Sequence, residues 1–549
     1  MSERRNLPIG IQTFEELRTK NCVYIDKTQF VDKLVRVGKP YFLSRPRRFG
    51  KSLFLSTLKS YFEGRKDLFE GLSLSETENE WKKYPVFYLD FNVGDFTDEE
   101  NFRKSLGIKL DQYEKIYGVR NPNATSPADR FSSLLQQAHE QTGLQAVILV
   151  DEYDKPLLNA IGNEELVDTF RKILKSFYGV IKGEDAHIQF AFITGVTRFD
   201  KVSIFSDLNN LNDISLNSDF TSVCGITQEE LEESFVPEIE LMAQENEISK
   251  EECIAELKKN YDGYHFSKNT KTDIYNPFSL MNAFFNNSFG SYWFSTGTPT
   301  FLTRMMKNIN FDYTSLEDEI EVGRRTIENY RLDSQNALPM LYQTGYITIK
   351  NYDKEFDSFI LGLPNKEVKY GLYENLVPLY AGYDGKSDNI EVLNFLKELR
   401  AGKVNEFMER INNIFAAAPK KSSQKCYELD CQAFVWLIFK LMGEFVLCEV
   451  QNGRGRERPA RGKTHKVSFE RVSEQLCCEG GWSDAVVWEK SAIYIFEFKI
   501  DKTAKEAMEQ INGKDYPISY KSDGRKIVKV AVNYSSEKEQ LDDWIIEEE

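Results

Sequence analysis

The segment from Ala146 to Val150 constrains the fold more than any other, because it is apolar at every position. A strand that faces solvent on one side alternates apolar and polar residues, whereas a strand covered on both faces reads as a continuous apolar run. Other short apolar segments alternate with helical patterns through the first 225 residues; they are Tyr41–Ser44, Val86–Phe91 and Ile188–Thr194. This alternation predicts an α/β fold with a parallel sheet and crossover helices.

A sequence typical of a phosphate-binding loop follows the first of these segments. It reads Ser-Arg-Pro-Arg-Arg-Phe-Gly-Lys-Ser and ends at Ser52, where a helical run begins. In such a loop, backbone N–H groups face a phosphate, a lysine contacts the β and γ oxygens, and a hydroxyl binds Mg²⁺. Gly50, Lys51 and Ser52 provide these groups, and Arg48 and Phe49 precede them as further nucleotide-binding candidates.

The loop motif is weak when it is taken alone. Arg45 occupies the position where the general Gly-x-x-x-x-Gly-Lys-Ser/Thr pattern has its first glycine. Support comes from Asp151 and Glu152, which directly follow the apolar strand. An aspartate at the carboxyl end of a buried strand can hold Mg²⁺, and the next glutamate can polarise an attacking water. The alternative is a solvated acidic turn, but both motifs in this order predict ATP binding and hydrolysis.

Polar residues at the end of the next strand extend the same predicted site. The segment Thr194–Arg198 reads Thr-Gly-Val-Thr-Arg, and in a parallel sheet it reaches the edge at which Asp151 lies. We expect Thr194 to sense the γ-phosphate. Arg198 either stabilises charge on the transferring phosphoryl group or forms a structural ion pair, and the sequence leaves both roles open.

A second candidate site lies in a predicted hairpin near the C terminus. Its strands read Asp-Ala-Val-Val-Trp, beginning at Asp484, and Ile-Tyr-Ile-Phe-Glu, ending at Glu497. If Trp488 faces Ile493, the antiparallel register places Asp484 directly opposite Glu497. Facing carboxylates repel each other unless a cation or a shared proton lies between them. Lys499 projects from the same face as Glu497, because side chains alternate along a strand.

Two carboxylates and a lysine on one face suit Mg²⁺ or Mn²⁺ and the hydrolysis of a phosphodiester. The alternative is an ordinary edge hairpin whose charges face water. A bulge of one residue would also undo the pairing, because register decides which residues face each other. The basic run between Arg454 and Arg471 either guides a nucleic-acid backbone or forms a solvated loop.

Composition limits the remaining possibilities. Acidic residues outnumber basic ones by 86 to 70, so a surface that is basic all over is excluded and any contact with nucleic acid must be local. The eight cysteines lack Cys-x-x-Cys spacing, which argues against a zinc ribbon. We find neither a signal peptide nor an apolar run of roughly 18 residues, so we expect a cytoplasmic protein that does not enter a membrane.

These motifs resemble those of a bacterial and archaeal family that joins an AAA-ATPase-like domain to a C-terminal PD-(D/E)XK nuclease domain. The resemblance covers nearly the whole chain, and the arginine-rich phosphate loop matches the family's own pattern. Its other signatures are Tyr24-Ile25-Asp26-Lys27-Thr28, Val150-Asp151-Glu152-Tyr153-Asp154, Thr194–Arg198, Tyr261-Asp262-Gly263-Tyr264, Ser483-Asp484, Phe496-Glu497-Phe498-Lys499 and Ala507-Met508-Glu509-Gln510-Ile511.

The resemblance implies roles for individual residues of the C-terminal domain. Asp484 and Glu497 would bind the metal ion, and Lys499 would assist the attacking water. Glu428, on an earlier helix, best fits an additional metal ligand. Gln510 would give polar support to the site.

The complete prediction is a P-loop NTPase parallel sheet with a helical lid and a connecting region, followed by an α/β domain of the restriction-endonuclease-like type. We divide the chain into an AAA-ATPase-like core (1–225), a lid (226–298), a connecting region of helices and a hairpin (299–425) and a nuclease-like domain (426–549). In the last two parts we expect helices over Pro299–Lys307, Glu391–Ile414 and Tyr427–Met442.

The predicted function is an ATPase coupled to a Mg²⁺-dependent nuclease. ATP and Mg²⁺ are the expected cofactors, with Mn²⁺ as an alternative at the nuclease site, and nucleic acid is the expected partner of the C-terminal domain. In the alternative, the ATP site is a nucleotide switch and the nuclease-like domain is an inactive binding platform. Whether the chain forms a homo-oligomer is left open.

Overall fold

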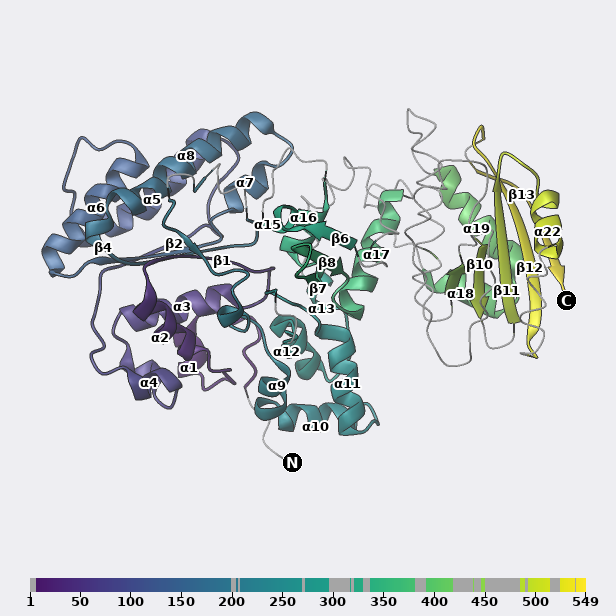
Figure 1. The fold of residues 1–549 in the computed structure, drawn as a ribbon, viewed down its shortest axis with the longest axis horizontal. Helices are drawn as coiled ribbons and strands as arrows, with labels where there is room; N and C mark the ends of the chain where they lie inside the picture. Colours follow the sequence, from purple (N-terminus) through teal and green to yellow (C-terminus); the bar gives the residue numbers. More distant parts are fainter. Residues whose placement is uncertain are drawn as a thin grey trace. The chain divides into compact units, whose positions relative to one another are not determined.

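The computed structural model describes most of the chain, and the structural statements that follow concern these residues (Figure 1). They are residues 6–198, 204–205, 208–268, 272–295, 316, 320–328, 336–380, 392–417, 438, 446–449, 484–488, 492–513, 524–538 and 540–549. The helices expected over Pro299–Lys307 and Tyr427–Met442 lie outside the described residues, apart from Ile438. The basic run between Arg454 and Arg471 also lies outside them.

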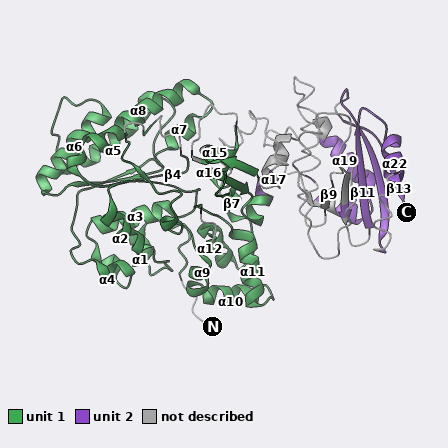
Figure 2. Cartoon of the chain, viewed as in Figure 1, with its two compact units in different colours: residues 1–309, 319–369 green, residues 310–318, 370–549 purple. Residues whose placement is uncertain are grey.

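The chain divides into two compact units (Figure 2). The first unit comprises residues 1–309 and 319–369, and the second comprises residues 310–318 and 370–549. Our finer division into four parts stays a prediction. Among the described residues, no helix combines the length and the apolar character that crossing a bilayer requires.

A five-stranded parallel sheet forms the centre of the first unit, with the strand order β2-β3-β4-β1-β5. The strands are β1 (Pro40–Ser44), β2 (Val86–Asp90), β3 (Ala146–Asp151), β4 (Ile188–Gly195) and β5 (Asn212–Asp213). Strand β3 is buried at every position, as its uninterrupted apolar sequence predicts. The parallel sheet and the α/β fold class are therefore confirmed.

Helices cover both faces of this sheet, as parallel strands require (Figure 1). On one face lie α1 (Phe14–Thr19), α2 (Thr28–Val37), α3 (Lys51–Phe62) and α4 (Ser73–Thr77). On the other face lie α5 (Glu99–Tyr117), α6 (Pro127–Thr142), α7 (Lys155–Ala160) and α8 (Glu164–Gly183). Among the described residues of this part, short 3-10 helices lie at Lys66–Phe69, Asp185–His187 and Ser218–Phe220.

The helices that follow the sheet lie within the predicted lid (226–298); that role stays a prediction, and we call them the lid helices. They are α9 (Gln228–Ser234), α10 (Val236–Glu245), α11 (Lys250–Tyr261), α12 (Pro277–Asn286) and α13 (Tyr292–Ser295). Capping boxes fix the start of α9, through Thr227 and Glu230, and the start of α11, through Ser249 and Glu252. Ile25, near the start of the chain, packs against the apolar core of these helices, so the N-terminal segment and the lid share one core.

A small antiparallel sheet completes the first unit. Its strands are β6 (Ile320–Gly323), β7 (Thr348–Asp353) and β8 (Ser358–Gly362) in the order β6-β8-β7, accompanied by α15 (Arg324–Glu328) and α16 (Leu338–Thr344). The hairpin expected in this region is present as β7 and β8. Helix α17 (Lys366–Tyr380) follows, and the boundary between the two units falls within it, after Lys369.

The second unit contains a mixed sheet with the order β13-β12-β11-β10-β9. Its elements are α18 (Val392–Arg400), α19 (Val404–Ala417), β9 (Val446–Glu449), β10 (Asp484–Trp488), β11 (Ala492–Ile500), α22 (Ala504–Gly513), β12 (Lys526–Ser535) and β13 (Gln540–Glu548). Strands β11 and β12 are parallel, and the other pairs are antiparallel. The single helix expected over Glu391–Ile414 was wrong: Gly402, with φ of 68°, lies between two helices.

Candidate functional site

The predicted ATP-site residues meet at the carboxyl edge of the parallel sheet. Strands β3, β4 and β1 are neighbours and run in the same direction, so their carboxyl ends lie side by side. Strand β1 leads into the phosphate loop, β3 ends at Asp151, and β4 carries Thr194. Lys51 and Glu152 join them, with 3.9 Å between the Lys51 Nζ and the Glu152 Oε1.

Gly50 and Lys51 form the turn from the phosphate loop into α3. Gly50 has a φ of 95°, a left-handed conformation that residues with a side chain adopt only at a cost. The Lys51 Nζ is buried and donates hydrogen bonds to the carbonyl oxygens of Arg45 (3.0 Å) and Pro46 (3.1 Å). The ammonium group therefore binds the loop's own carbonyls in this structure, and a phosphate would compete with them for it.

Asp151 lies in a setting that suits a magnesium ion. The Thr194 hydroxyl donates a hydrogen bond of 2.8 Å to the Asp151 Oδ1, and the Ser52 hydroxyl, like that of Thr194, opposes the rise that burial causes in the pKa of this carboxyl group. Burial raises the pKa of the Asp151 carboxyl. A buried carboxylate beside a hydroxyl offers oxygen ligands, and Mg²⁺ in nucleotide sites takes the rest of its ligands from phosphates and water. The residues present thus fit the expected ion.

A Mg²⁺ ion held by Asp151 would need the additional ligands from phosphates and water. Among the described residues, no group of three or more His, Cys, Asp or Glu side chains is arranged to hold a metal ion. A site with one carboxylate and one hydroxyl has low affinity for Mg²⁺ until substrate phosphates complete it. Such a site would therefore bind the ion and a nucleotide together.

Glu152 has an unusual backbone conformation. Its φ is 53°, which is uncommon for a residue other than glycine and is often found at functional sites. Its side chain is mostly buried, at 12% exposure, and lies beside the ammonium group of Lys51. A carboxylate in this position can accept a proton from water that attacks a bound γ-phosphate.

Arg198 forms a structural ion pair, which is one of the two roles that the sequence left open. Its Nη2 lies 2.5 Å from the Oδ2 of Asp213, and both side chains are 6% exposed. Its backbone N–H donates to the Oε1 of Gln343 over 2.8 Å. The Arg198 Nε and Nη1 are buried and have no hydrogen-bond partner among the described residues. These two donors keep a contact with phosphate chemically feasible.

The contacts of Arg45 explain why an arginine stands in place of the first glycine of the general phosphate-loop pattern. Its guanidinium group is buried and donates to the carbonyl oxygens of Ser215 (2.8 Å) and Phe220 (3.0 Å). The same group lies 4.3 Å from the centre of the Phe266 ring, a cation–π distance. Arg45 thus ties the end of β1 to later segments and lies outside the predicted phosphate contacts.

The structure places Arg48 and Phe49 against the segments that follow the sheet. The Arg48 guanidinium lies 4.8 Å from the centre of the Phe278 ring on α12. Phe49 is fully buried and makes edge-to-face contacts with Tyr264 (4.8 Å) and Phe266 (5.3 Å). Both residues therefore connect the loop to the region of the lid helices. In the part of the chain that the structure describes, neither side chain forms a hydrogen bond or an ion pair with Lys51 or Asp151.

Asp154 lies beside this site and was not among the functional residues predicted from the sequence. Its buried carboxylate accepts hydrogen bonds from the backbone N–H groups of Val196 (3.1 Å) and Thr197 (2.6 Å). Burial raises the pKa of the Asp154 carboxyl. Gly195 lies so close that an added Cβ would stand 2.5 Å from the Tyr153 ring. Asp154 therefore holds the loop after β4, and the Asp-Glu-Tyr-Asp signature was the signal that pointed to it.

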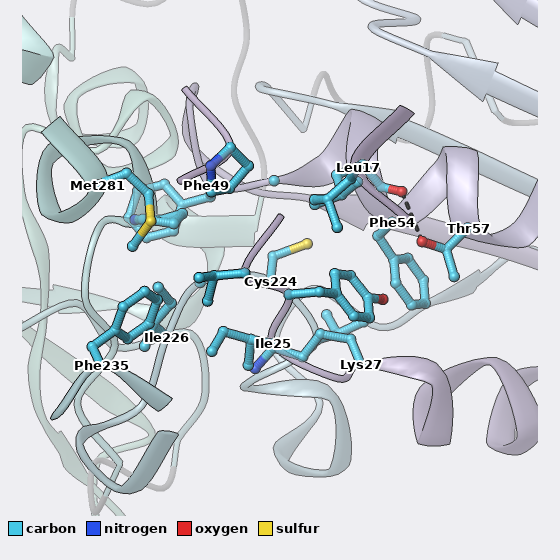
Figure 3. A pocket seen from close by; sticks show the side chains of 18 residues that line it. Leu17, Ile25, Lys27, Phe49, Phe54, Thr57, Cys224, Ile226, Phe235 and Met281 are labelled. Carbon is cyan, nitrogen blue, oxygen red and sulfur yellow. Dashed lines mark hydrogen bonds between the residues drawn. The ribbon is translucent and has the colours of Figure 1, made fainter. Parts of the chain in front are cut away.

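A largely apolar cavity of about 100 Å³ lies beside the phosphate loop (Figure 3). It lies between the N-terminal segment, α3 and the lid helices. Ile25, Leu53, Ile226 and Met281 contribute apolar side chains to its wall, and Gly50 borders it. The cavity is adjacent to the residues predicted to contact phosphate. Those residues are polar or charged, whereas the wall of the cavity is largely apolar.

Lys27 is the charged residue in the cavity wall. Its Nζ lies 2.5 Å from the Oε1 of Glu230 on α9, so an ion pair joins the N-terminal segment to the first lid helix. Burial lowers the pKa of the Lys27 ammonium. Lys27 belongs to the Tyr-Ile-Asp-Lys-Thr family signature, and only the fold brings it next to Glu230, 203 residues away.

The second unit places Glu497 and Lys499 on one face of β11, as the alternation of side chains predicts. Both are buried, and the Lys499 Nζ lies 2.6 Å from the Glu497 Oε1. Phe496 and Phe498 stack on each other at 6.2 Å between ring centres, on the other face. The Glu497 Oε2 has no hydrogen-bond partner among the described residues. A buried carboxylate oxygen without a partner is costly, and a bound divalent cation would satisfy it.

The register of the hairpin agrees with the prediction. Trp488 faces Ile493, and the same register continued to the start of β10 places Asp484 opposite Glu497. On its other side, Asp484 pairs through its backbone with Glu449 of β9. Three acidic positions therefore follow one another across β9, β10 and β11. Glu449 was not predicted from the sequence, because its segment is far from the hairpin in the chain.

Glu428 and Gln510 are the other residues predicted for the nuclease-like site. Glu428, the additional metal ligand implied by the resemblance, lies outside the described residues. Gln510 lies on α22, which packs against the sheet through Ala507 and Ile511, and its side chain is half-buried. The structure therefore assembles Glu497 and Lys499, sets Asp484 in register, and leaves the contribution of Glu428 a prediction.

Together these features define a class of protein, an ATPase-like α/β core that shares its chain with a nuclease-like domain. Residues 8–205 match the family described as "Predicted AAA-ATPase", and residues 467–544 match the PD-(D/E)XK nuclease superfamily. The chain is 31% identical over 553 aligned positions to the "Uncharacterized protein in vnfD 5'region" of Azotobacter chroococcum mcd 1, with 99% of both chains covered. No solved structure matches the chain.

The chain therefore belongs to the family that joins an AAA-ATPase-like domain to a C-terminal PD-(D/E)XK nuclease superfamily domain. The family predicted from the motifs is confirmed. These domains suggest ATPase and nuclease-like activity, and a nuclease-like domain suggests an interaction with nucleic acid.

Proposed function

We propose that this protein binds and hydrolyses ATP and that its nucleotide state controls Mg²⁺-dependent cleavage of phosphodiester bonds in nucleic acid. The observation that carries the proposal is the convergence of Lys51, Asp151, Glu152 and Thr194 at one edge of the sheet. A cation, a metal-binding carboxylate and a base within one small volume are the groups that phosphoryl transfer to water requires.

Each residue of the ATP site has a role that follows from its position. Lys51 exchanges its bonds to the carbonyls of Arg45 and Pro46 for bonds to the β and γ phosphates. Mg²⁺, when bound, neutralises phosphate charge. Asp151 would hold it together with the Ser52 hydroxyl. The hydrogen bond from Thr194 favours the ionised form of Asp151, which is the form that binds a cation.

The cavity beside the phosphate loop provides a place for the base of the nucleotide. Its apolar walls suit the faces of a purine ring, and Gly50, the residue before Lys51, lines it. The Lys27–Glu230 ion pair borders the cavity and keeps the N-terminal segment and α9 together around it.

At the nuclease site, Glu497 and Asp484 would hold the divalent cation, and Lys499 would orient the attacking water. The ion pair between Lys499 and Glu497 keeps the ammonium group beside the carboxylate. Mn²⁺ would occupy the same oxygen ligands, because both ions prefer carboxylates and water.

Purified full-length protein tests the proposal when it is incubated with Mg²⁺ or Mn²⁺ and single- and double-stranded DNA and RNA, with and without ATP. We expect phosphate release from ATP and cleavage of at least one nucleic acid that changes when ATP is added. ATP hydrolysis without any cleavage would favour the alternative, a nucleotide switch with a binding platform. Absence of ATP binding would contradict the proposal as a whole.

A further inference from the structure

The phosphate loop, residues 45–52, is held by contacts that phosphate binding itself does not need. The Trp293 Nε1 on α13 donates a hydrogen bond of 3.2 Å to the carbonyl oxygen of Arg47. On the other side of the loop, Phe49 packs edge to face against Tyr264, with 4.8 Å between ring centres. Both contacts come from segments more than 200 residues later in the chain. A movement of the loop would therefore change the contacts that these segments make.

The first contact leads to the start of α17 through Glu367. The Glu367 Oε1 accepts hydrogen bonds from the backbone N–H groups of Tyr292 (2.5 Å) and Trp293 (2.7 Å). Its Oε2 accepts a hydrogen bond of 2.7 Å from the Ser279 hydroxyl on α12. Glu367 is 3% exposed. A buried carboxylate with three donors fixes its neighbours strongly, so Trp293 and the first turn of α17 are held as one body.

The second contact leads to the same turn by another route. Tyr264 follows Gly263, and an added Cβ on Gly263 would stand 2.4 Å from the carbonyl oxygen of Pro364. Asn365 donates a hydrogen bond of 2.8 Å to the carbonyl oxygen of Asp262 and accepts one of 3.1 Å, also through its side chain, from the N–H of Val368 in α17. The Tyr-Asp-Gly-Tyr signature therefore contacts the phosphate loop on one side and the start of α17 on the other.

Phosphate binding would rearrange the loop in a way to which these contacts are sensitive. In the structure, Lys51 bonds to the carbonyls of Arg45 and Pro46, the two residues that precede Arg47. A bound phosphate takes the ammonium group away from those carbonyls and frees them. The carbonyl that Trp293 holds belongs to the next residue, so a shift of this turn changes the Trp293–Arg47 hydrogen bond directly.

We propose that Trp293 and Glu367 are positioning residues that couple the phosphate loop to α17, and that this coupling is how nucleotide binding regulates the C-terminal unit. The boundary between the two units lies within this continuous helix, four residues after its start. A helix transmits a displacement of its first turn along its length, because each residue is bonded to the residue four positions away. The inference rests on the ATP site proposed above.

Hydrogen exchange in the full-length protein tests the coupling without depending on nuclease activity. Amide exchange is measured in peptides covering residues 45–52 and residues 366–380, with and without Mg²⁺ and a non-hydrolysable ATP analogue. In the unmodified protein, we expect the analogue to slow exchange in the loop and to change the exchange rates in α17 by at least about threefold.

Two variants separate the coupling from nucleotide binding. Trp293→Phe keeps an aromatic ring but removes the donor to Arg47. We expect it to bind the analogue and protect the loop while the response of α17 is weakened, because only the second route, through Tyr264, remains. Trp81→Phe is the matched control, because the Trp81 Nε1 also donates to a backbone carbonyl, that of Glu78, in a different part of the first unit. Glu367→Gln should weaken the response of α17 as Trp293→Phe does.

The outcomes distinguish failure of the coupling from failure of the proposed ATP site. Loop protection in the unmodified protein with no change in α17 would overturn the coupling and leave ATP binding intact. An α17 response in Trp293→Phe equal to that of Trp81→Phe would overturn the role of Trp293. No protection of the loop and no binding of the analogue would overturn the ATP site, and the coupling with it.

Discussion

The hydroxyl of Thr194 donates a hydrogen bond of 2.8 Å to the carboxylate of Asp151, although 43 residues separate them in the chain. Adjacent parallel strands bring the two together, and the bond favours the ionised carboxylate against the burial that raises its pKa. The charge state of the predicted metal ligand therefore depends on a neighbouring strand.

Thr194→Val should remove this hydrogen bond at nearly constant volume. The pKa of Asp151 should rise further, so the acid limb of the pH profile for ATP hydrolysis should move to higher pH. We also expect a loss of about 1–2 kcal/mol in the free energy of unfolding, because a buried acceptor loses a donor. Phosphate release measured from pH 5 to 8, together with urea denaturation, checks both effects. An unchanged acid limb would show that Asp151 is not the titrating ligand.

Lys51→Ala and Glu152→Gln should give different defects. The lysine variant should bind ATP at least about tenfold more weakly, which corresponds to about 1.4 kcal/mol, because it lacks the cation for the β and γ phosphates. The glutamine variant should retain affinity and lose hydrolysis, because it lacks the base. Nucleotide titration and phosphate release measure the two properties separately. Equal ATP affinity in Lys51→Ala and the unmodified protein would rule out the phosphate-loop assignment.

Met281→Trp should fill the apolar cavity and exclude the base. We expect ATP affinity to fall by about tenfold or more while the affinity for inorganic tripolyphosphate stays within about twofold, because the phosphate contacts are untouched. Phe285→Trp, an exposed position on the same helix, is the matched control and should behave as the unmodified protein. Equal losses for both ligands in Met281→Trp would mean that the cavity does not hold the base.

Glu497→Gln should abolish metal-dependent cleavage and leave ATP hydrolysis largely intact. Without metal, it should lower the free energy of unfolding by about 3 kcal/mol, because it breaks the buried pair with Lys499. Sequence reasoning alone, which considers repulsion between facing carboxylates, predicts a slight gain in stability instead, and that expectation now applies only to Asp484→Asn.

A melting series in chelator and in Mn²⁺ measures these effects. Mn²⁺ should raise the Tm of the unmodified protein more than that of either carboxylate variant, through ligand linkage. The double variant Glu497→Gln/Lys499→Met is the control for the broken ion pair and should recover part of the lost stability without recovering a response to Mn²⁺. Equal metal-induced shifts in all proteins would show that the hairpin is not a metal site.

Asp262 should make the stability of the first unit depend on pH. Burial raises the pKa of its carboxyl to about 6, so between about pH 4 and pH 6 the folded protein keeps a proton that the unfolded chain has released. The stability contributed by the protonated form is present below this window and is lost as the pH rises through it. In the unmodified protein we expect the free energy of unfolding to fall by about 1–3 kcal/mol between this acidic range and neutral pH. Asp262→Asn should abolish this fall, because asparagine does not titrate.

Denaturation of the full-length protein at pH 4.5 and 7.5 checks the sign of this effect. Asp273→Asn is a control of opposite sign, because hydrogen bonding to His265 lowers the pKa of Asp273 and its ionised form stabilises the fold. The asparagine variant at position 262 should therefore gain stability at pH 7.5, and the variant at position 273 should lose it. A loss at both positions would show that Asp262 is stabilising as an anion.

Much of the fold and part of the site could be predicted from local sequence patterns. The apolar run of β3, the glycine before α3 and the alternation that places Glu497 and Lys499 on one face all follow from the geometry of a strand or a turn. The break at Gly402 was missed, because a glycine inside an apolar pattern is compatible with both a continuous helix and a helix end.

The sequence by itself determined the family, the parallel sheet, the phosphate loop and the hairpin register, because each depends on side-chain periodicity or on residues adjacent in the chain. Only the tertiary structure decided that Arg198 pairs with Asp213, that Lys27 meets Glu230, and that Trp293 holds the phosphate loop. Such contacts join segments whose adjacency depends on how the helices and strands pack, and many partners of equal charge or polarity compete for each of them. Packing selects one partner because buried polar groups must be satisfied within the fold that the local patterns have produced.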